Sequence, residues 1–406
     1  MPTTSLTPRH AAAITAVLGL LSLFPPLATD MYLAAIGDLA ASMKASHSAA
    51  ELSLSIFFLG LCAGQIVMGP LIDGYGRKTP LLFGAALFTA TSVVLPLIGD
   101  ITLFNLVRFL QAIGASSGMV VGRAVVRDLY DGQRAAKVMT VLVMLLTIGP
   151  IVSPTLGSLL LEAFGWRSIF CTMALVSVVA LVASLLILPE TLPLAKRASR
   201  PFRTGVSTAR MLLLRRSFVV PALTAGLVQA GMFAFITGSS GVFQGVFGLS
   251  SLQYGLVFAV IAAALVVFGR VNTLLLNRFT PGQILSAVLP AHVAVALVLT
   301  LLSDVSSIWV FIAPLWLTIG LVGLLSANAM SIAMGAAHEG AGIGSALLGA
   351  IQFGIAFSVS SCVALGGTHT PLPMALGLLL PSGLATVIWI AARRREPVDD
   401  VLTDGA

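Results

Sequence analysis

The chain has 406 residues, of which 58% are hydrophobic and only 9% are Asp, Glu, Lys or Arg. A soluble domain carries about 25% charged residues, so the composition excludes a soluble globular protein of this length. The net charge of +7 does not indicate nucleic-acid binding, because the basic residues are spread over the connections between apolar stretches.

Apolar stretches long enough to cross a bilayer recur along the whole chain. About 20 helical residues span the hydrocarbon core of roughly 30 Å, and a helix satisfies its own backbone hydrogen bonds in lipid. The predicted spans are 12–35, 49–71, 80–98, 102–124, 138–161, 169–188, 217–240, 252–274, 283–302, 307–331, 342–366 and 373–392. The predicted fold class is therefore an all-α integral membrane protein with about 12 transmembrane helices.

Positive charge is distributed unevenly between the loops. Of the 22 Lys and Arg residues, Arg108 lies inside a span, and only Lys44 and Arg167 fall in odd-numbered loops. The other 19 lie in or beside the even-numbered loops or at the chain ends. Because basic loops stay on the cytoplasmic side, we predict a multi-pass protein of the bacterial inner membrane with both termini in the cytoplasm.

The longest polar connection, at about 189–216, holds seven Lys and Arg residues and separates six spans from six. Transporters built from internal repeats have this layout. The predicted organisation is an N-terminal six-helix bundle at 1–190, a basic cytoplasmic linker at 191–216, and a C-terminal six-helix bundle with a cytoplasmic tail at 217–406.

Two charged residues stand out inside the predicted spans, Asp30 in span 1 and Arg108 in span 4. A charge at mid-membrane costs about 2.5–3.5 kcal/mol on insertion scales, so it is usually paired or functional. In the predicted topology the two residues lie at nearly equal depth, five or six residues from the outer ends of their spans. We expect Asp30 to carry a proton and Arg108 to tune it; a purely structural ion pair is the alternative. Glu51, at the outer start of span 2, is interpreted as a boundary residue.

A glycine-rich charged segment, Gly69-Pro-Leu-Ile-Asp73-Gly-Tyr-Gly76-Arg77-Lys78, joins spans 2 and 3. Glycines allow a tight turn, and Asp73 is expected at a helix start, where the dipole favours an acid. The segment resembles the loop signature G-x-L-x-D-x-x-G-R-[KR] of the major facilitator superfamily. The resemblance implies that Gly69, Asp73, Gly76, Arg77 and Lys78 form a cytoplasmic gate that latches the two halves in one state.

Two further elements resemble the same superfamily. Arg108-Phe-Leu-Gln111-Ala-Ile-Gly114 is similar to an R-x-x-Q-G/A-x-G element whose arginine is linked to proton transfer. In span 5, Gly149, Pro150, Pro154 and Gly157 match G-P-x-x-x-P-x-x-G, the signature of exporters that exchange substrate for protons. An ordinary proline-kinked helix is the alternative for span 5.

Three shorter segments narrow the resemblance to the bicyclomycin/chloramphenicol-resistance (Bcr/CflA) branch of drug:proton antiporters. They are Thr29-Asp30-Met31-Tyr32-Leu33, Gly122-Arg123-Ala-Val-Val-Arg127-Asp128 and Gly165-Trp166-Arg167-Ser-Ile-Phe170. The second of them adds Arg123 and Arg127 to the predicted gate. Some multidrug relatives carry a second acid two turns earlier in helix 1, where this chain has Ser22, so Asp30 is expected to act alone.

The resemblance also places a substrate cavity between the halves, lined chiefly by helices 1, 4, 7 and 10. The candidate lining residues, which are polar, aromatic or sulfur-containing, are Tyr32, Gln65, Met119, Gln229, Phe233, Asn328 and Gln352. Methionine and aromatic side chains suit a pocket that accepts varied apolar compounds. Ordinary helix packing is the alternative for each of them.

Nothing in the chain indicates an enzyme. Gly114-Ala-Ser116-Ser-Gly118 fits a hydrolase nucleophile pattern, but that pattern needs a strand-to-helix turn, and here it lies within a predicted helix. The three cysteines show no metal or redox spacing, and we predict no cofactor. The predicted function is proton-coupled efflux of small amphipathic drug-like molecules by a monomer, with substrate, protons and the lipid bilayer as partners. A dedicated exporter of one metabolite or antibiotic, or a proton-coupled importer, is the alternative.

Overall fold

The computed structural model describes residues 8–130, 132–305, 307–337, 341–367 and 370–394. These residues form helices and connections, with no strand among them. The predicted C-terminal tail, residues 395–406, lies outside the described residues.

Within the described residues, 12 helical spans are long and apolar enough to cross a bilayer, as predicted. The first span is broken into α1 (Pro8–Ser22), α2 (Phe24–Asp30), η1 (Leu33–Ala35) and α3 (Ile36–Ser42). The other spans are α4 (His47–Tyr75), α5 (Lys78–Val94) with η2 (Leu95–Leu97), α6 (Ile101–Leu129), α7 (Gly132–Phe164), α8 (Trp166–Ile187), α10 (Arg216–Ser240) with η4 (Gly241–Val246), α11 (Ser251–Leu275), α12 (Pro281–Leu301), α13 (Ile308–Gly335), α14 (Ala341–Leu365) and α15 (Leu372–Arg393). The connection between α8 and α10 carries η3 (Leu194–Lys196) and α9 (Pro201–Leu214).

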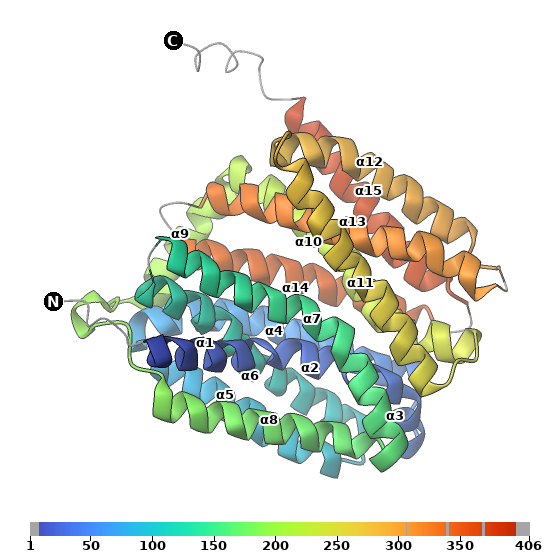
Figure 1. The fold of residues 1–406 in the computed structure, drawn as a ribbon, viewed down its shortest axis with the longest axis horizontal. Helices are drawn as coiled ribbons and strands as arrows, with labels where there is room; N and C mark the ends of the chain where they lie inside the picture. The colour runs from blue at the N-terminus through green and yellow to red at the C-terminus, as the bar shows by residue number, and fades with distance from the viewer. Residues whose placement is uncertain (1–7, 131, 306, 338–340, 368–369, 395–406) are drawn as a thin grey trace.

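The first six and the last six spans form two layers in Figure 1, the blue-to-green helices α1–α8 in one and the yellow-to-red helices α10–α15 in the other. The layers meet mainly along two helix pairs, α4 with α14 and α7 with α11. This arrangement confirms the predicted all-α membrane fold of two six-helix bundles. Below, the linker end of the molecule is the end that carries α9, and the far end is the opposite one, where α4 begins at His47.

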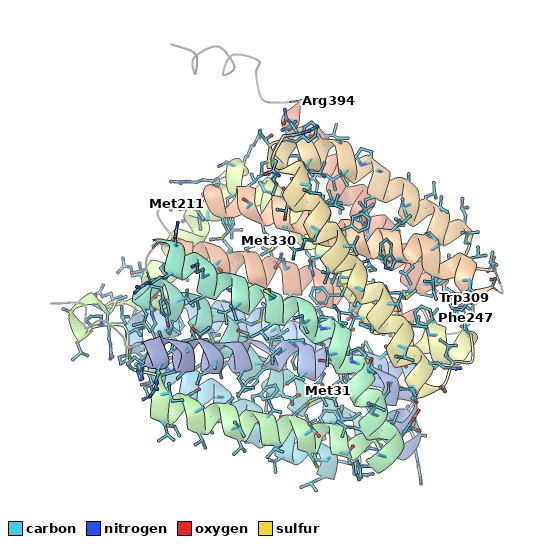
Figure 2. All side chains as sticks on the ribbon, viewed as in Figure 1. Met31, Met211, Phe247, Trp309, Met330 and Arg394 are labelled. Carbon is cyan, nitrogen blue, oxygen red and sulfur yellow. The ribbon has the colours of Figure 1, made fainter. Side chains whose placement is uncertain are left out.

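Large apolar side chains cover the outside of both bundles (Figure 2). Phe83, Leu186 and Val387 are 65%, 81% and 64% exposed. Trp309 is 76% exposed at the end of the molecule opposite Met211, as the labels in Figure 2 show. Soluble proteins rarely leave such large apolar patches in water, whereas a lipid-facing surface accepts them, with tryptophan favoured at the membrane boundary.

The break in the first span follows from its sequence. Pro25 and Pro26 are the second and third residues of α2. Proline has no amide N–H to donate to the preceding turn and clashes with its carbonyl groups, so α1 ends at Ser22 and the helix restarts at Phe24. A second interruption follows Asp30, which is thereby the last residue of α2. Interrupted spanning helices occur at the binding sites of transporters.

The segment 69–78 is helical for most of its length. α4 continues to Tyr75 and α5 begins at Lys78, so that Gly76 and Arg77 make the turn. Gly76 has a φ angle of 89°, in the left-handed region that favours glycine. The expectation that Asp73 starts a helix is wrong, because Asp73 lies in the last turn of α4. The helix dipole disfavours an acid there, and the ion pair between Asp73 Oδ1 and Arg77 Nη1, at 2.7 Å, offsets this.

Candidate functional site

Asp30 lies inside the protein at the end of α2 and is only 1% exposed. Its Oδ1 accepts a hydrogen bond of 2.8 Å from the Thr29 hydroxyl group. Among the described residues, no Lys, Arg or His nitrogen lies within 4.0 Å of the Asp30 carboxylate. This carboxyl group can therefore exchange a proton without first breaking an ion pair.

Arg108 on α6 is fully buried beside the first span, but it does not form the direct pair with Asp30 that equal depth allows. Its Nη2 donates to the Ala28 carbonyl oxygen at 2.7 Å, and its Nη1 donates to Gln111 Oε1 at 2.6 Å. Gln111 Nε2 in turn donates to Ser92 Oγ at 2.8 Å. The arginine is thus tied to the backbone of α2 two residues before Asp30.

Aromatic rings hold the other side of the Arg108 guanidinium group. The guanidinium carbon lies 4.6 Å from the ring centre of Tyr32 and 4.4 Å from that of Phe57. Tyr32, a predicted cavity residue, is fully buried, with its hydroxyl 2.6 Å from Ser53 Oγ and its ring centre 5.7 Å from that of Phe170. In this structure Tyr32 therefore positions Arg108.

The span 5 motif brings α7 into direct contact with the break in the first span. A Cβ atom built at Gly157 would overlap the Met31 carbonyl oxygen, and one at Gly149 would lie 2.9 Å from Pro26 Cβ. Only glycine allows two helices to approach so closely. The prolines that lie between these two glycines inside α7 are Pro150 and Pro154. The motif therefore packs against the residue that follows Asp30.

Arg77 forms two ion pairs at the linker end, which are called the latch below. Its Nη1 lies 2.7 Å from Asp73 Oδ1 and its Nε lies 2.9 Å from Asp128 Oδ2. These two ion pairs join the ends of α4 and α6, both in the N-terminal bundle. Arg77 therefore braces one half of the molecule.

Glu190, which sequence reasoning missed, completes this latch. Its carboxylate accepts hydrogen bonds from the backbone amides of Arg77 and Lys78 at 2.8 and 3.2 Å. Burial raises the pKa of Glu190, but the amides of Arg77, Leu192 and Lys78 and the charge of Arg197 outweigh it and hold the pKa below 4.5. The only sequence signal was a lone acid directly after span 6, at the start of a basic linker.

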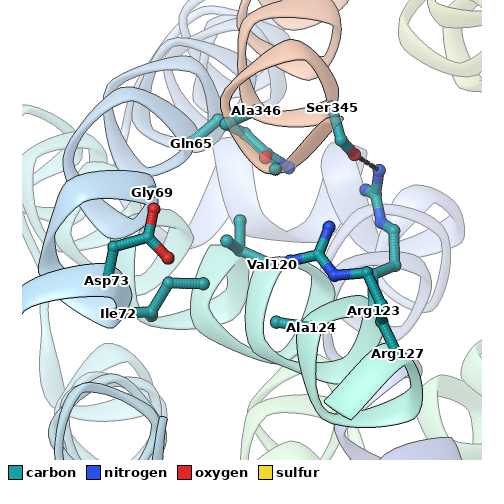
Figure 3. A pocket seen from close by; sticks show the side chains of 11 residues that line it. Gln65, Gly69, Ile72, Asp73, Val120, Arg123, Ala124, Arg127, Ser345 and Ala346 are labelled. Atoms are coloured by element: carbon teal, nitrogen blue, oxygen red, sulfur yellow. Dashed lines mark hydrogen bonds between the residues drawn. The ribbon is translucent and has the colours of Figure 1, made fainter. Parts of the chain in front are cut away.

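Arg123 and Arg127 on α6 line a narrow cavity between the halves at the linker end. Figure 3 shows Arg123 reaching across to Ser345 on α14, with a hydrogen bond of 2.6 Å from Nη1 to Ser345 Oγ. The cavity also exposes Gly69 and Asp73 of the signature. Its full lining is Gln65, Gly69, Ile72, Asp73, Val120, Arg123, Ala124, Arg127, Gly342, Ser345 and Ala346.

The two halves also touch at the far end. Gln244 Nε2, in the π-helical end of the seventh span, donates to the Ala34 carbonyl oxygen at 3.3 Å. Thr155 Oγ1 on α7 donates to the Gly255 carbonyl oxygen at 3.2 Å. The halves are therefore in contact at both ends of the molecule.

Some of the predicted cavity residues come together between the halves. Gln65 Nε2 lies 3.9 Å from the Met119 sulfur atom. The ring centre of Phe233 lies 4.5 Å from that of Phe58 and 5.7 Å from that of Phe353. Phe58 and Phe353 were missed because an apolar residue in an apolar span carries no mark that separates cavity from core.

The other candidates are placed differently. Asn328 lies within the C-terminal bundle, where its Nδ2 donates to Asn272 Oδ1 at 2.7 Å, so it joins α13 to α11. Gln352 on α14 has a buried amide nitrogen without a hydrogen-bond partner among the described residues. Gln229 is half-buried on α10, one turn before Phe233.

Glu51 is not the boundary residue expected from the sequence. It is 1% exposed in the first turns of α4, and neither carboxylate oxygen has a hydrogen-bond partner among the described residues. The nearest basic side chain among the described residues is His47, with 3.4 Å between its Nε2 and Glu51 Oε1. The expectation failed because a residue near the end of a span can still be covered by other parts of the protein.

Known proteins resemble this chain over most of its length. The profile of the Major Facilitator Superfamily matches residues 18–361. The uncharacterized MFS-type transporter YdgK of Bacillus subtilis (strain 168) is 32% identical over 374 residues, covering 91% of this chain and 92% of that protein. A bicyclomycin resistance protein homolog of Haemophilus influenzae is 28% identical over 380 residues, covering 92% and 94%. The multidrug resistance protein MdtL of Escherichia coli O157:H7 is 32% identical over 332 residues, covering 82% and 83%.

Solved structures share the fold. The crystal structure of a D-xylose-proton symporter superposes with a TM-score of 0.73 at 15% identity, covering 95% of this chain and 98% of that one. The human organic anion transporter MFSD10 (TETRAN) gives a TM-score of 0.65 at 18% identity, covering 94% and 99%. At these identities the likeness concerns the fold alone.

Proposed function

We propose that this chain, which belongs to the Major Facilitator Superfamily, exports small amphipathic drug-like molecules in exchange for protons. The superfamily match and the 12 spans make it a multi-pass membrane transporter. The relatives named for bicyclomycin resistance and multidrug resistance confirm the resemblance to the Bcr/CflA branch. Their names support drugs as the substrate class; proton coupling and the outward direction belong to the proposal.

The observation that carries the proposal is the buried carboxyl group of Asp30 at the break in the first span. It lacks a cation partner within 4.0 Å among the described residues, and it lies within electrostatic range of Tyr254 on α11, in the opposite half. Burying an unpaired charge away from water costs free energy. Gain or loss of a proton at Asp30 therefore changes how favourably the halves close around it.

The exchange then runs as an alternation of two states. Asp30 takes a proton from the far side, which is the predicted outer face, while drug leaves there. When the halves reopen toward the linker end, Asp30 gives up the proton and drug binds. The proton and the drug each shift the equilibrium between the two states only by the difference in their affinity for those states. Exchange therefore requires that the proton and the drug favour different states.

The remaining residues have supporting roles in this proposal. Arg108 holds α2 in place through Ala28, and the α7 motif presses on Met31. The moving units are the N-terminal bundle at 1–190 and the C-terminal bundle at 217–406, joined by the linker at 191–216. The protein acts as a monomer in the bacterial inner membrane, with both termini in the cytoplasm.

The test uses the full chain in proteoliposomes with an imposed pH gradient and a panel of ethidium, chloramphenicol and bicyclomycin. Wild-type protein is expected to move at least two of these unrelated compounds uphill. Asp30→Asn is expected to lose uphill transport and to keep counterflow of drug without a gradient. The control is Asp38→Asn, the same change at an exposed position of the same span.

Each contrary result contradicts a different part of the proposal. Full gradient-driven transport by Asp30→Asn would reject the proton site. Transport of a single compound would indicate a dedicated exporter. Uptake in the same direction as the protons would indicate an importer.

A further inference from the structure

Glu51 is a second buried carboxyl group that the proposed cycle does not yet use. Both of its oxygens are buried without a hydrogen-bond partner among the described residues, although the side chain belongs to the second turn of α4. A carboxyl group in this condition either holds a proton or needs a cation nearby. The basic side chain within reach is His47, one helical turn away on the same face.

His47 connects Glu51 to the far side. Its Nε2 is buried and points toward Glu51 Oε1, while the side chain as a whole is 31% exposed. One edge of the imidazole therefore faces Glu51 and the rest of the ring reaches the surface. Histidine is the side chain best suited to pass a proton near neutral pH.

Glu51 and Asp30 both lie within electrostatic range of Tyr254, a residue of the opposite half. Tyr254 is fully buried on α11, and its hydroxyl lies 2.8 Å from Ser239 Oγ on α10. Among the described residues, His47 is the titratable group beside Glu51 on its own helix, and Tyr254 is the one in electrostatic range on the opposite half. No Lys or Arg nitrogen of the described residues lies within 4.0 Å of Glu51.

We propose that Glu51 is a second proton-carrying residue, loaded from the far side through His47, so that export exchanges two protons for each drug molecule. This inference rests on the proposed function. The protonated imidazole gives its Nε2 proton to Glu51 Oε1 and keeps the proton on Nδ1. The neutral ring then regains a proton on Nε2 from water when it rotates toward the surface. With Glu51 and Asp30 both neutral, the far-end contact around Tyr254 closes without burying two negative charges.

Protons carried per drug molecule are the first measurement. Wild-type protein, reconstituted as full chain with a pH indicator inside the vesicles, is expected to move two protons per chloramphenicol. Glu51→Gln is expected to halve this ratio to one. His47→Gln is expected to slow proton entry and leave the ratio at two. Glu162→Gln, an exposed acid on α7, is the matched control and is expected to behave as wild type.

Infrared titration of the purified protein is the second measurement, and it does not depend on transport. The protonated-carboxyl band is expected to lose one component in Glu51→Gln and a different component in Asp30→Asn. Glu51→Asp, which keeps a carboxyl group, is expected to restore the lost component, which separates loss of the group from misfolding.

The outcomes distinguish this inference from the function it rests on. If Glu51→Gln keeps the wild-type ratio and the wild-type spectrum while Asp30→Asn is inactive, Glu51 carries no proton and only this inference fails. If wild-type protein moves no protons with chloramphenicol, ethidium or bicyclomycin, the antiport function itself fails and two-proton exchange fails with it.

Discussion

Replacing Gly157 by alanine tests the contact between the α7 motif and the first span. Gly157 lies against Met31, the residue after Asp30, at the point where α2 ends. We expect Gly157→Ala to lower both thermal stability and drug export, because the added methyl group has no space.

The size of the effect follows from the distances. The new Cβ atom would lie 2.7 Å from the carbonyl carbon and 3.1 Å from the Cα atom of Met31. Non-bonded carbons prefer about 3.5–4.0 Å, so the two helices must separate by about 1 Å. Overpacking of this kind costs typically 1–3 kcal/mol. A displacement of about 1 Å at a reacting group can cost about 100-fold in rate, so we expect export to fall at least tenfold.

The assay compares Gly157→Ala with Gly383→Ala by melting temperature in detergent and by export in proteoliposomes. A Cβ atom at Gly383 on α15 meets nothing within 4 Å, and alanine is the better helix former by about 1 kcal/mol. Gly383→Ala is therefore expected to match or exceed wild-type stability. Equal stability and equal export for the two variants would refute the close packing of α7 on the break.

Three further substitutions probe the site. Arg108→Lys keeps the charge but cannot reach both Ala28 and Gln111, so we expect uphill drug transport to be lost while the amount of folded protein, checked by gel filtration, stays unchanged. Glu190→Gln is expected to lower the melting temperature at pH 7. Because the folded-state pKa of Glu190 is held below 4.5, its stabilisation is fully present above pH 4.5 and is lost as the pH falls through that lowered value, so the two melting curves should converge in acid. Asn328→Leu leaves its asparagine partner on α11 unpaired and should lower the free energy of unfolding by about 1–3 kcal/mol. The set of exported drugs, measured with the same panel, should not change; a changed set would indicate that Asn328 contacts the drug.

Much of the fold could be predicted because lipid restricts the choices. Every backbone amide must be paired inside the bilayer, so the length and hydropathy of the apolar stretches were enough to predict the number of spans and their order. The break in the first span was missed, although Pro25 and Pro26 mark it plainly, because a count of apolar residues does not register an interrupted helix. The turn at Gly76 was predicted too long, since α4 stays helical past Gly69 and Pro70 as far as Tyr75.

The sequence suggested that Arg108 lies near the first span, and Arg108 does bind Ala28 there. The direction of its guanidinium group was not predicted, because it depends on the acceptors around it. Here the guanidinium group turns to the Ala28 carbonyl group and to the rings of Tyr32 and Phe57. The burial of Glu51 depends on helices distant in sequence, and no local pattern in α4 reports it.

The contact between Arg123 and Ser345 joins the two halves at the linker end and is expected to favour the state closed there. Arg123 Nη1 donates a hydrogen bond of 2.6 Å to Ser345 Oγ, and hydrogen bonds that involve a charged group contribute about 1.5–3 kcal/mol. Since 1.4 kcal/mol is a factor of ten in an equilibrium, Ser345→Ala should favour the state open at the linker end by about tenfold or more. Distances between spin labels on α6 and α14 would report the shift. If the populations do not move, closure at the linker end depends on helix packing and not on this hydrogen bond.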